Sequence, residues 1–172
     1  YLSANIRSKS NLNGHLMKNL PIDGVPNELK NSIFVFEYND YESLKKIVRK
    51  NNIGIIKMEV SRNYLPKNNF LKKIRKLCNK KKIILIFDEC TSGFRQCNGG
   101  LHKVYGVNPD ILVLGKALGN GYAINAIIGR KEIMKFANNS FISSTFWTEK
   151  IGYVAALKTL EVMEKTKSWI KI

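Results

Sequence analysis

The sequence has few of the features that mark several common classes of protein. It contains three cysteines in 172 residues, Cys78, Cys90 and Cys97, and no C-x-x-C pair. An odd number of cysteines at these spacings argues against a disulfide framework or a zinc site and is typical of a reducing compartment. No apolar run approaches the roughly 18 residues that a membrane-spanning helix needs. We therefore predict a cytoplasmic protein without a metal site or a membrane partner.

Acidic residues are also scarce, since 13 Asp and Glu stand against 29 Lys and Arg, a formal net charge of +16. Such an excess of positive charge can mark a surface that binds nucleic acid. The basic residues are scattered or close predicted helices, as at Lys80–Lys82, and they do not alternate with aromatic residues as a single-strand binding surface requires. We predict no nucleic-acid partner, and a non-catalytic basic nucleic-acid-binding module is the alternative of a different class.

Three familiar motifs are absent or incomplete. The pair Gly115–Lys116 does not belong to a Walker A loop, because Asp110 replaces the first glycine of that motif and Ala117 replaces its Ser or Thr. The stretch Gly119–Gly121 precedes a predicted strand and lacks the third glycine of a dinucleotide-binding fingerprint. The G-x-S-x-G elbow of α/β hydrolases does not occur.

What the sequence does contain is a regular alternation of apolar runs and amphipathic stretches. Predicted strands cover Ser32–Tyr38, Ile53–Val60, Ile83–Phe87, Ile111–Leu114 and Asn125–Gly129. Predicted helices begin after Asp40, after Asn68 or Asn69, at Lys131 (to Ala137) and at Glu149 (to about Lys165). Strands that alternate with helices indicate right-handed crossovers. The predicted fold class is therefore α/β, with a mainly parallel sheet flanked by helices.

The spacing of apolar residues predicts which face of each helix is buried. In the first helix these residues are Tyr41, Leu44, Ile47 and Val48. In the second they are Phe70, Leu71, Ile74, Leu77 and Cys78. In the last helix we expect Ile151, Val154, Leu157 and Leu160 to point inward.

The stretch from Ile83 to Lys116 carries the candidate chemistry. One apolar run ends in Asp88 and the next in Lys116, and ligands of open α/β sheets bind beyond the carboxyl ends of such strands. We therefore expect both side chains to face one crevice. A lysine can form a Schiff base with pyridoxal phosphate (PLP), and a carboxylate can keep the ring nitrogen of this cofactor protonated. Spacing alone also fits two ordinary residues at strand ends.

Three segments in this order resemble one enzyme family: FDECTSGFR (residues 87–95), GVNPDILVLGKALGNGY (106–122) and SSTFW (143–147). They are similar to the class III, fold type I, PLP-dependent aminotransferases, in particular the branch that includes glutamate-1-semialdehyde aminomutase. The resemblance implies that residues 1–172 are an incomplete PLP-binding large domain of a homodimer. We expect the N-terminal part of that domain and a C-terminal small domain to lie outside this chain, and the chain alone to be inactive.

The resemblance also assigns candidate site residues by position. Asp88 corresponds to the residue that pairs with the pyridine nitrogen, and Lys116 to the Schiff-base lysine that also moves the substrate proton. Cys90 stands where the family usually has Val against the ring face. Thr145 corresponds to the threonine that binds the cofactor phosphate from the neighbouring subunit. Glu59 resembles a Glu near the active site that Pro usually follows, and here Val follows it.

Three further residues near the motifs have structural expectations only. We expect Glu89 and Arg95 to hold the loop, and His102 to lie on a helix surface. The implied substrate is a small amine or carbonyl compound, such as an amino acid, amino sugar or semialdehyde. The run SSTFWTEK differs from the Gly-Thr-x-x-Gly-Asn-Pro run of true glutamate-1-semialdehyde aminomutases. We therefore predict an aminotransferase, with the aminomutase, or a decayed fragment without function, as alternatives.

Overall fold

A computed structural model describes residues 26–29 and 32–172 of the chain. The chain divides into two compact units, residues 1–52 and 53–172, which we consider separately. The described part of the first unit holds a short 3₁₀ helix, η3 (Asn27–Leu29), and the helix α1 (Tyr41–Lys50). All other helices and strands in the described ranges belong to the second unit.

The helix α1 begins as the sequence predicts. The backbone N–H of Ser43 donates to the Asp40 carboxylate over 2.9 Å, which satisfies one of the donors left free at a helix start. Leu44 and Val48 are buried on the predicted face. The strand predicted over Ser32–Tyr38 is wrong, because in the described part of the chain residues 33–37 pair with no strand. An alternating apolar pattern suits a strand, but a strand also needs a neighbour for its backbone.

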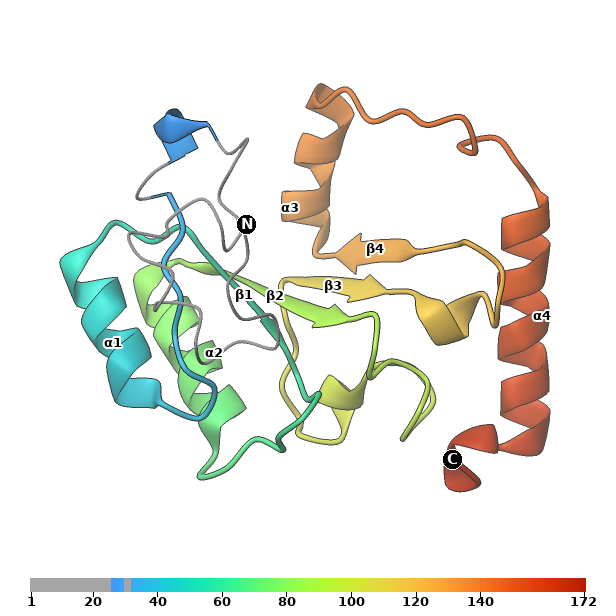
Figure 1. The fold of residues 1–172 in the computed structure, drawn as a ribbon, viewed down its shortest axis with the longest axis horizontal. Coiled ribbons are helices and arrows are strands. Elements are labelled where there is room, and N and C mark those ends of the chain that lie inside the picture. Colours follow the sequence, from blue (N-terminus) through green and yellow to red (C-terminus); the bar gives the residue numbers. More distant parts are fainter. Residues whose placement is uncertain (1–25, 30–31) are drawn as a thin grey trace. The chain divides into compact units, whose positions relative to one another are not determined.

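The second unit is built on a four-stranded sheet in the order β1 (Ile55–Glu59), β2 (Ile84–Glu89), β3 (Ile111–Leu114) and β4 (Ala126–Gly129). The strands β1, β2 and β3 run parallel, and β4 pairs antiparallel with β3, as the arrows in Figure 1 show. The predicted α/β fold with a mainly parallel sheet is confirmed.

The helix α2 (Phe70–Lys81) connects β1 to β2 and buries the predicted stripe. Its buried residues are Phe70, Leu71, Ile74, Leu77 and Cys78. The helix begins directly after Asn69, as predicted, but the capping role that its Asn would suggest is wrong: Asn69 has a left-handed backbone, with φ 57°, and its side chain makes no capping hydrogen bond. A residue that caps a helix start usually has an extended backbone, which aims its side chain at the free N–H groups.

One face of the sheet forms the core with α2. The buried strand residues are Ile56 and Met58 of β1, Leu85 and Phe87 of β2, and Leu112 and Leu114 of β3. Their neighbours along each strand point to the opposite face, which is only partly covered. This alternation decides where the polar residues at the strand ends point, because successive side chains of a strand face opposite sides.

The C-terminal part holds the remaining helices. They are the short α3 (Lys131–Met134) with η6 (Lys135–Asn139), the long α4 (Ile151–Thr166) and η7 (Ser168–Ile170). Two more 3₁₀ helices, η4 (Leu101–Lys103) and η5 (Lys116–Leu118), lie beside β2 and β3 in the sequence. Within the described ranges no helix combines the length and the apolar character that a bilayer crossing requires.

The predicted inner face of α4 is wrong. Ile151, Val154 and Leu157 are 60%, 64% and 68% exposed, whereas Gly152 and Ala156 are buried. Gly152 lies against the side chains of Tyr122 and Ile124, so the face of α4 with the small residues is the one that packs on this turn. The large apolar residues of α4 consequently point outward.

Candidate active site

The strand β2 continues through Asp88 and Glu89, two residues beyond the predicted end. Because side chains alternate along a strand, these two carboxylates point to opposite faces of the sheet. The side chain of Asp88 is 27% exposed and that of Glu89 is fully buried. Two adjacent acidic residues therefore have different environments, one on the open face and one in the core.

Asp88 is held by the side chain of Lys57 and by the backbone and thiol of Cys90. The ammonium of Lys57, on β1, lies 3.0 Å from one carboxylate oxygen, and the N–H of Cys90 donates to the other oxygen over 3.2 Å. Partial burial raises the pKa of Asp88, but the Lys57 ammonium and the Cys90 N–H outweigh burial and hold the pKa below its usual value. At neutral pH the open face of the sheet therefore presents a carboxylate.

Lys116 follows β3 and begins η5 with a left-handed backbone, φ 46°. This conformation costs an L-residue about 1–2 kcal/mol and is often found at functional sites. Its amine donates to the hydroxyl of Thr91 over 2.8 Å, and Thr91 lies in the loop that follows Asp88. The hydrogen bond ties the end of β3 to the end of the neighbouring strand β2.

Cys90 lies between these two charged groups. Burial and the Asp88 carboxylate raise the pKa of its thiol, and the ammonium of Lys116 lowers it, so both charges act on one sulfur atom. Gly115 completes this edge: a side-chain carbon there would lie 3.2 Å from the Cys90 sulfur and would overlap the side chain of Asn125. The structure thus brings Asp88, Cys90 and Lys116 to one edge of the sheet.

Thr145 does not join this cluster within the chain. It is exposed, and its side chain makes no hydrogen bond to another described residue. It lies in the connection between η6 and α4, which follows a different path from the ends of β2 and β3 (Figure 1). The role that the family resemblance gives to Thr145 would require a second subunit.

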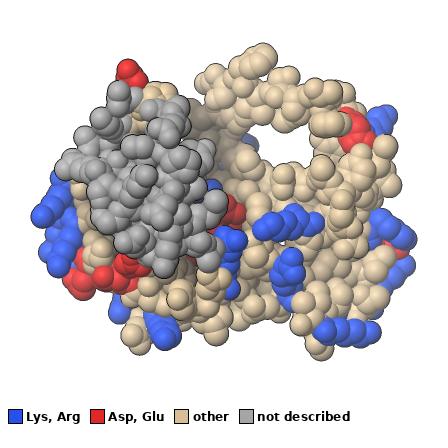
Figure 2. Space-filling model, in the orientation of Figure 1, with Lys and Arg blue, Asp and Glu red and all other residues tan. Residues whose placement is uncertain are grey.

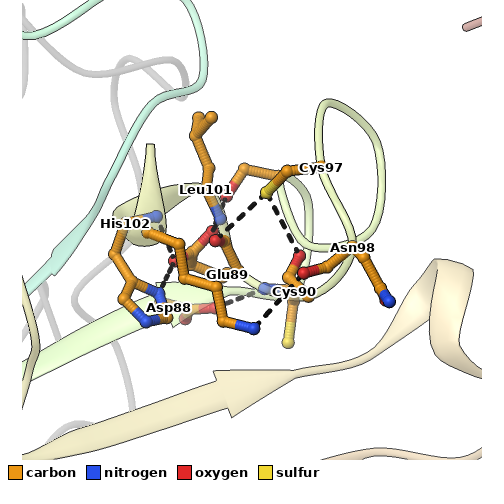
Figure 3. A network of polar contacts seen from close by, with 11 residues as sticks. Asp88, Glu89, Cys90, Cys97, Asn98, Leu101 and His102 are labelled. Carbon is orange, nitrogen blue, oxygen red and sulfur yellow. Dashed lines mark hydrogen bonds and ion pairs between the residues drawn. The ribbon is translucent and has the colours of Figure 1, made fainter. Parts of the chain in front are cut away.

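Glu89 is the centre of a buried network that fixes the loop after β2 (Figure 3). Its carboxylate accepts hydrogen bonds from the Ser92 hydroxyl at 2.9 Å and from the backbone N–H groups of Leu101 and His102. The Nδ1 atom of His102 lies 2.6 Å from the same carboxylate. Burial raises the pKa of Glu89, but His102 and the backbone donors outweigh burial and hold the pKa below its usual value.

The expectation that His102 lies on a helix surface is wrong, since His102 is buried against Glu89. Gly100 makes this pairing possible, because a side-chain carbon there would lie 2.7 Å from the Glu89 carboxylate. The expectation that Glu89 and Arg95 hold the loop is confirmed: the Arg95 side chain donates to the carbonyl of Thr91 over 2.6 Å. Thr91 is thereby held on its backbone side while its hydroxyl accepts from Lys116.

Asp110 anchors the strand that leads to Lys116. Its buried carboxylate accepts from the Leu85 N–H at 2.8 Å and pairs with Arg75 and Arg130 at 2.9 and 3.1 Å. These contacts join the start of β3 to β2, α2 and the end of β4. Sequence reasoning treated Asp110 only as part of a motif. The burial of the Asp110 carboxylate between strands could not be predicted from the sequence.

Glu59 stands directly beside Asp88 in the register of β1 and β2. One of its carboxylate oxygens lies 3.3 Å from the guanidinium of Arg62. The other is buried and has no hydrogen-bond partner among the described residues. Glu59 therefore lies at the same edge of the sheet as the candidate site. It pairs with Arg62, whereas Asp88 pairs with Lys57.

Comparison with known proteins agrees with the fold and with the candidate site at this strand edge. The family model described as Aminotransferase class-III matches residues 62–171, which is more than half of the sequence. The chain therefore belongs to the class III aminotransferase family. The matched range includes β2, β3 and the loop between them, and thus Asp88, Cys90, Lys116 and Thr145.

Two curated relatives illustrate the kinds of enzyme that the chain resembles. The 3-aminobutyryl-CoA aminotransferase of Cloacimonas acidaminovorans is 42% identical over 153 residues, which are 84% of this chain and 37% of that protein. The glutamate-1-semialdehyde 2,1-aminomutase of Nitrosopumilus maritimus is 37% identical over 154 residues, which are 85% of this chain and 36% of that protein. The chain thus spans little more than a third of the length of these curated relatives.

A solved structure shows the same arrangement of elements. The FumI protein of Sphingopyxis sp. MTA144, in its PLP internal aldimine form, superposes with a TM-score of 0.77 and is 25% identical. The match covers 82% of this chain and 36% of that chain. The fold type predicted from the sequence motifs, a PLP-transferase large domain, is confirmed by this likeness.

Proposed function

We propose that the protein to which this chain belongs is a PLP-dependent aminotransferase that moves an amino group between a small amine and a carbonyl compound. Membership of the class III family supports the reaction class. The observation that supports the site is that Asp88 lies at the end of β2 and Lys116 follows the neighbouring strand β3, with the charges of both groups acting on Cys90. These are the two groups that a pyridine ring nitrogen and an aldehyde require of a protein.

The donor set fits the cofactor. When bound, PLP supplies an aldehyde that takes up the amino group and a ring that withdraws electrons from the adjacent carbon. Asp88, which is ionised at neutral pH, would accept a hydrogen bond from the protonated ring nitrogen. Cys90 would pack against the ring. Gly115 leaves the end of β3 without a side chain that could obstruct it.

Lys116 would carry out two tasks with one nitrogen atom. Its unprotonated Nζ is the nucleophile toward the aldehyde. Once the substrate amine has taken its place, the freed Nζ would move the proton between the substrate carbon and the cofactor carbon. The Thr91 hydroxyl, 2.8 Å from Nζ, offers the free amine a defined resting position at the edge of the sheet.

We further propose that the enzyme is a homodimer in which Thr145 binds the cofactor phosphate of the neighbouring site. The segment around Thr145 exposes three large aromatic side chains, Phe141, Phe146 and Trp147, by 98%, 73% and 58%. In Figure 2 the same segment is almost free of charged side chains. Exposed aromatic side chains are typical of an interface, and a second copy of the chain is the partner that would bring Thr145 to a site.

The substrate belongs to the small amines and carbonyl compounds, and we favour an aminotransferase over an aminomutase. The run SSTFWTEK departs from the mutase pattern. The relative described as an aminotransferase is 42% identical and the aminomutase of Nitrosopumilus maritimus is 37% identical.

The three free cysteines, with Cys78 buried and its pKa raised by burial to about 11, support a reducing compartment, the cytoplasm.

Borohydride reduction tests the proposal. The full-length protein is incubated with PLP, reduced, digested and mapped by mass spectrometry. We expect a phosphopyridoxyl group on Lys116 and none at this position in a Lys116→Ala variant. The exposed Lys131 should stay unlabelled and serves as an internal control. A label spread over surface lysines, or DNA or RNA binding that weakens with salt and no label at Lys116, would instead support the basic binding module.

A further inference from the structure

Lys57 is a cation at the candidate site to which neither the sequence motifs nor the family resemblance gives a role. It lies on β1, whose side chains at positions 57 and 59 share the open face of the sheet with Asp88. Its ammonium is 3.0 Å from the Asp88 carboxylate. The pair is partly exposed, with 48% of the Lys57 side chain and 27% of the Asp88 side chain accessible to solvent.

The geometry leaves room for a further donor on Asp88. A carboxylate offers about four lone-pair positions on its two oxygens. Lys57 takes one on one oxygen, the Cys90 N–H takes one on the other, and the Cys90 thiol takes a third, which leaves one. A ring N–H could therefore bind Asp88 without displacing Lys57. The charge of the carboxylate would then be shared between two cations.

The other charged and titratable groups around Asp88 do not replace this pairing. Glu59, beside it on β1, lies 3.3 Å from the guanidinium of Arg62. The Cys90 thiol has a raised pKa and is neutral at neutral pH. From the side of β3, the Lys116 amine donates to Thr91. Within the described part of the chain, Asp88 forms its ion pair with Lys57.

We propose that Lys57 is a positioning and tuning residue that offsets the charge of Asp88, so that a bound PLP ring nitrogen holds its proton less tightly than beside an unpaired aspartate. This inference rests on the proposed function. A nearby opposite charge stabilises a protonated nitrogen, and a nearby like charge destabilises it. With Lys57 present, the ring nitrogen meets a carboxylate that is already paired. Lys57 would thus moderate the electron withdrawal by the ring.

The test measures the ring nitrogen directly. PLP labelled with ¹⁵N in the ring is bound to the full-length protein, and its ¹⁵N chemical shift is followed against pH. In Lys57→Met we expect the proton affinity of the ring nitrogen to rise about two- to fivefold, the range that a partly exposed ion pair allows. Lys57→Arg keeps the charge and should match the wild type.

Arg62 provides a matched control, because its side chain is also 48% exposed and also pairs with a carboxylate of this edge, that of Glu59. Arg62→Met removes the same unit of charge and should leave the ring nitrogen unchanged. A second measurement compares the dissociation constants of PLP and 1-deaza-PLP, which lacks the ring nitrogen. The preference for PLP should rise in Lys57→Met by the same two- to fivefold factor.

The inference is overturned if Lys57→Met and Arg62→Met shift the ring nitrogen equally, if Lys57→Arg shifts it as much as Lys57→Met, or if the preference for PLP falls. Borohydride labelling of each variant separates this result from a failure of the proposed function. Absence of a label on Lys116 in the wild type counts against the proposed function. A label on Lys116 together with an unchanged ring nitrogen in Lys57→Met counts against Lys57 alone.

Discussion

The loop after β2 and the segment that leads into α4 differ in where their side chains find contacts. In the loop, the buried carboxylate of Glu89 finds its partners in Ser92, Leu101 and His102 of the same chain. In the segment, Phe141, Phe146 and Trp147 remain exposed to solvent. The loop beside Asp88 thus makes its contacts within the chain, whereas our proposal assigns the exposed aromatic residues beside Thr145 to contact with a second subunit.

The largest expected effect comes from breaking the loop network. Glu89→Ala leaves the buried His102 and two backbone N–H groups without their acceptor, and should lower the free energy of unfolding by about 3–5 kcal/mol. Urea denaturation measures the change. Glu132→Gln, at a side chain that is 70% exposed, should change it by less than about 0.5 kcal/mol. Equal effects of both variants would refute a self-contained loop.

The second prediction concerns Asp110, which anchors the other strand of the site. Asp110→Asn weakens contacts to Arg75, Arg130 and the Leu85 N–H and should cost about 1.5–3 kcal/mol. Burial raises the pKa of Asp110, but these donors outweigh burial and lower the pKa. The contribution of its charge is therefore full above an unfolded pKa of about 3.9 and disappears as pH falls through the lower folded pKa. The variant should show a flatter loss of stability in acid.

The third prediction tests the exposed segment. Replacing both Phe146 and Trp147 by Ser should leave the unfolding of the subunit nearly unchanged, since both side chains are exposed. The same variant should weaken the association of two subunits by tenfold or more, on the order expected for aromatic residues at the centre of an interface. Analytical ultracentrifugation measures the association. A wild type that stays monomeric at high concentration would contradict the role given to this segment.

The smallest expected effect concerns the start of two helices, one with a side-chain cap and one without. Asp40→Ala removes a capping hydrogen bond and should cost about 1 kcal/mol, as caps of this type do. Lys150→Ala, at the start of α4, removes a side chain that makes no capping hydrogen bond from a backbone with negative φ, so we expect no such loss. Both variants are compared by thermal unfolding. An equal loss at both positions would contradict the difference in capping.

Periodicity made much of the fold predictable. The four strands of the sheet and the buried stripe of α2 follow from apolar runs and from the spacing of Phe70, Ile74 and Leu77. The placement of Asp88 and Lys116 at the carboxyl ends of neighbouring strands followed from the same runs. Apolar character alone, however, cannot tell a buried face from an exposed one, and for this reason the outward face of α4 was assigned to the interior.

Other features depend on contacts between distant residues. The separation of Asp88 from Glu89 requires that β2 continue two residues beyond its apolar run. The burial of His102 requires Gly100 and a partner thirteen residues earlier in the chain. The strand predicted over 32–38 lacked a neighbour that the sequence could not supply. Local patterns describe single elements, and these features belong to pairs of elements.

The most direct test of the account is whether Asp88 and Lys116 act on one ligand. The dissociation constants of PLP and 1-deaza-PLP are measured for the full-length wild type and for Asp88→Asn, and Lys116 is mapped after borohydride reduction in both. We predict that Asp88→Asn weakens PLP by about tenfold, as loss of a charge-assisted hydrogen bond does, and leaves 1-deaza-PLP unchanged, with the label on Lys116 throughout. Equal weakening of both compounds, or a label elsewhere than on Lys116, would contradict the account.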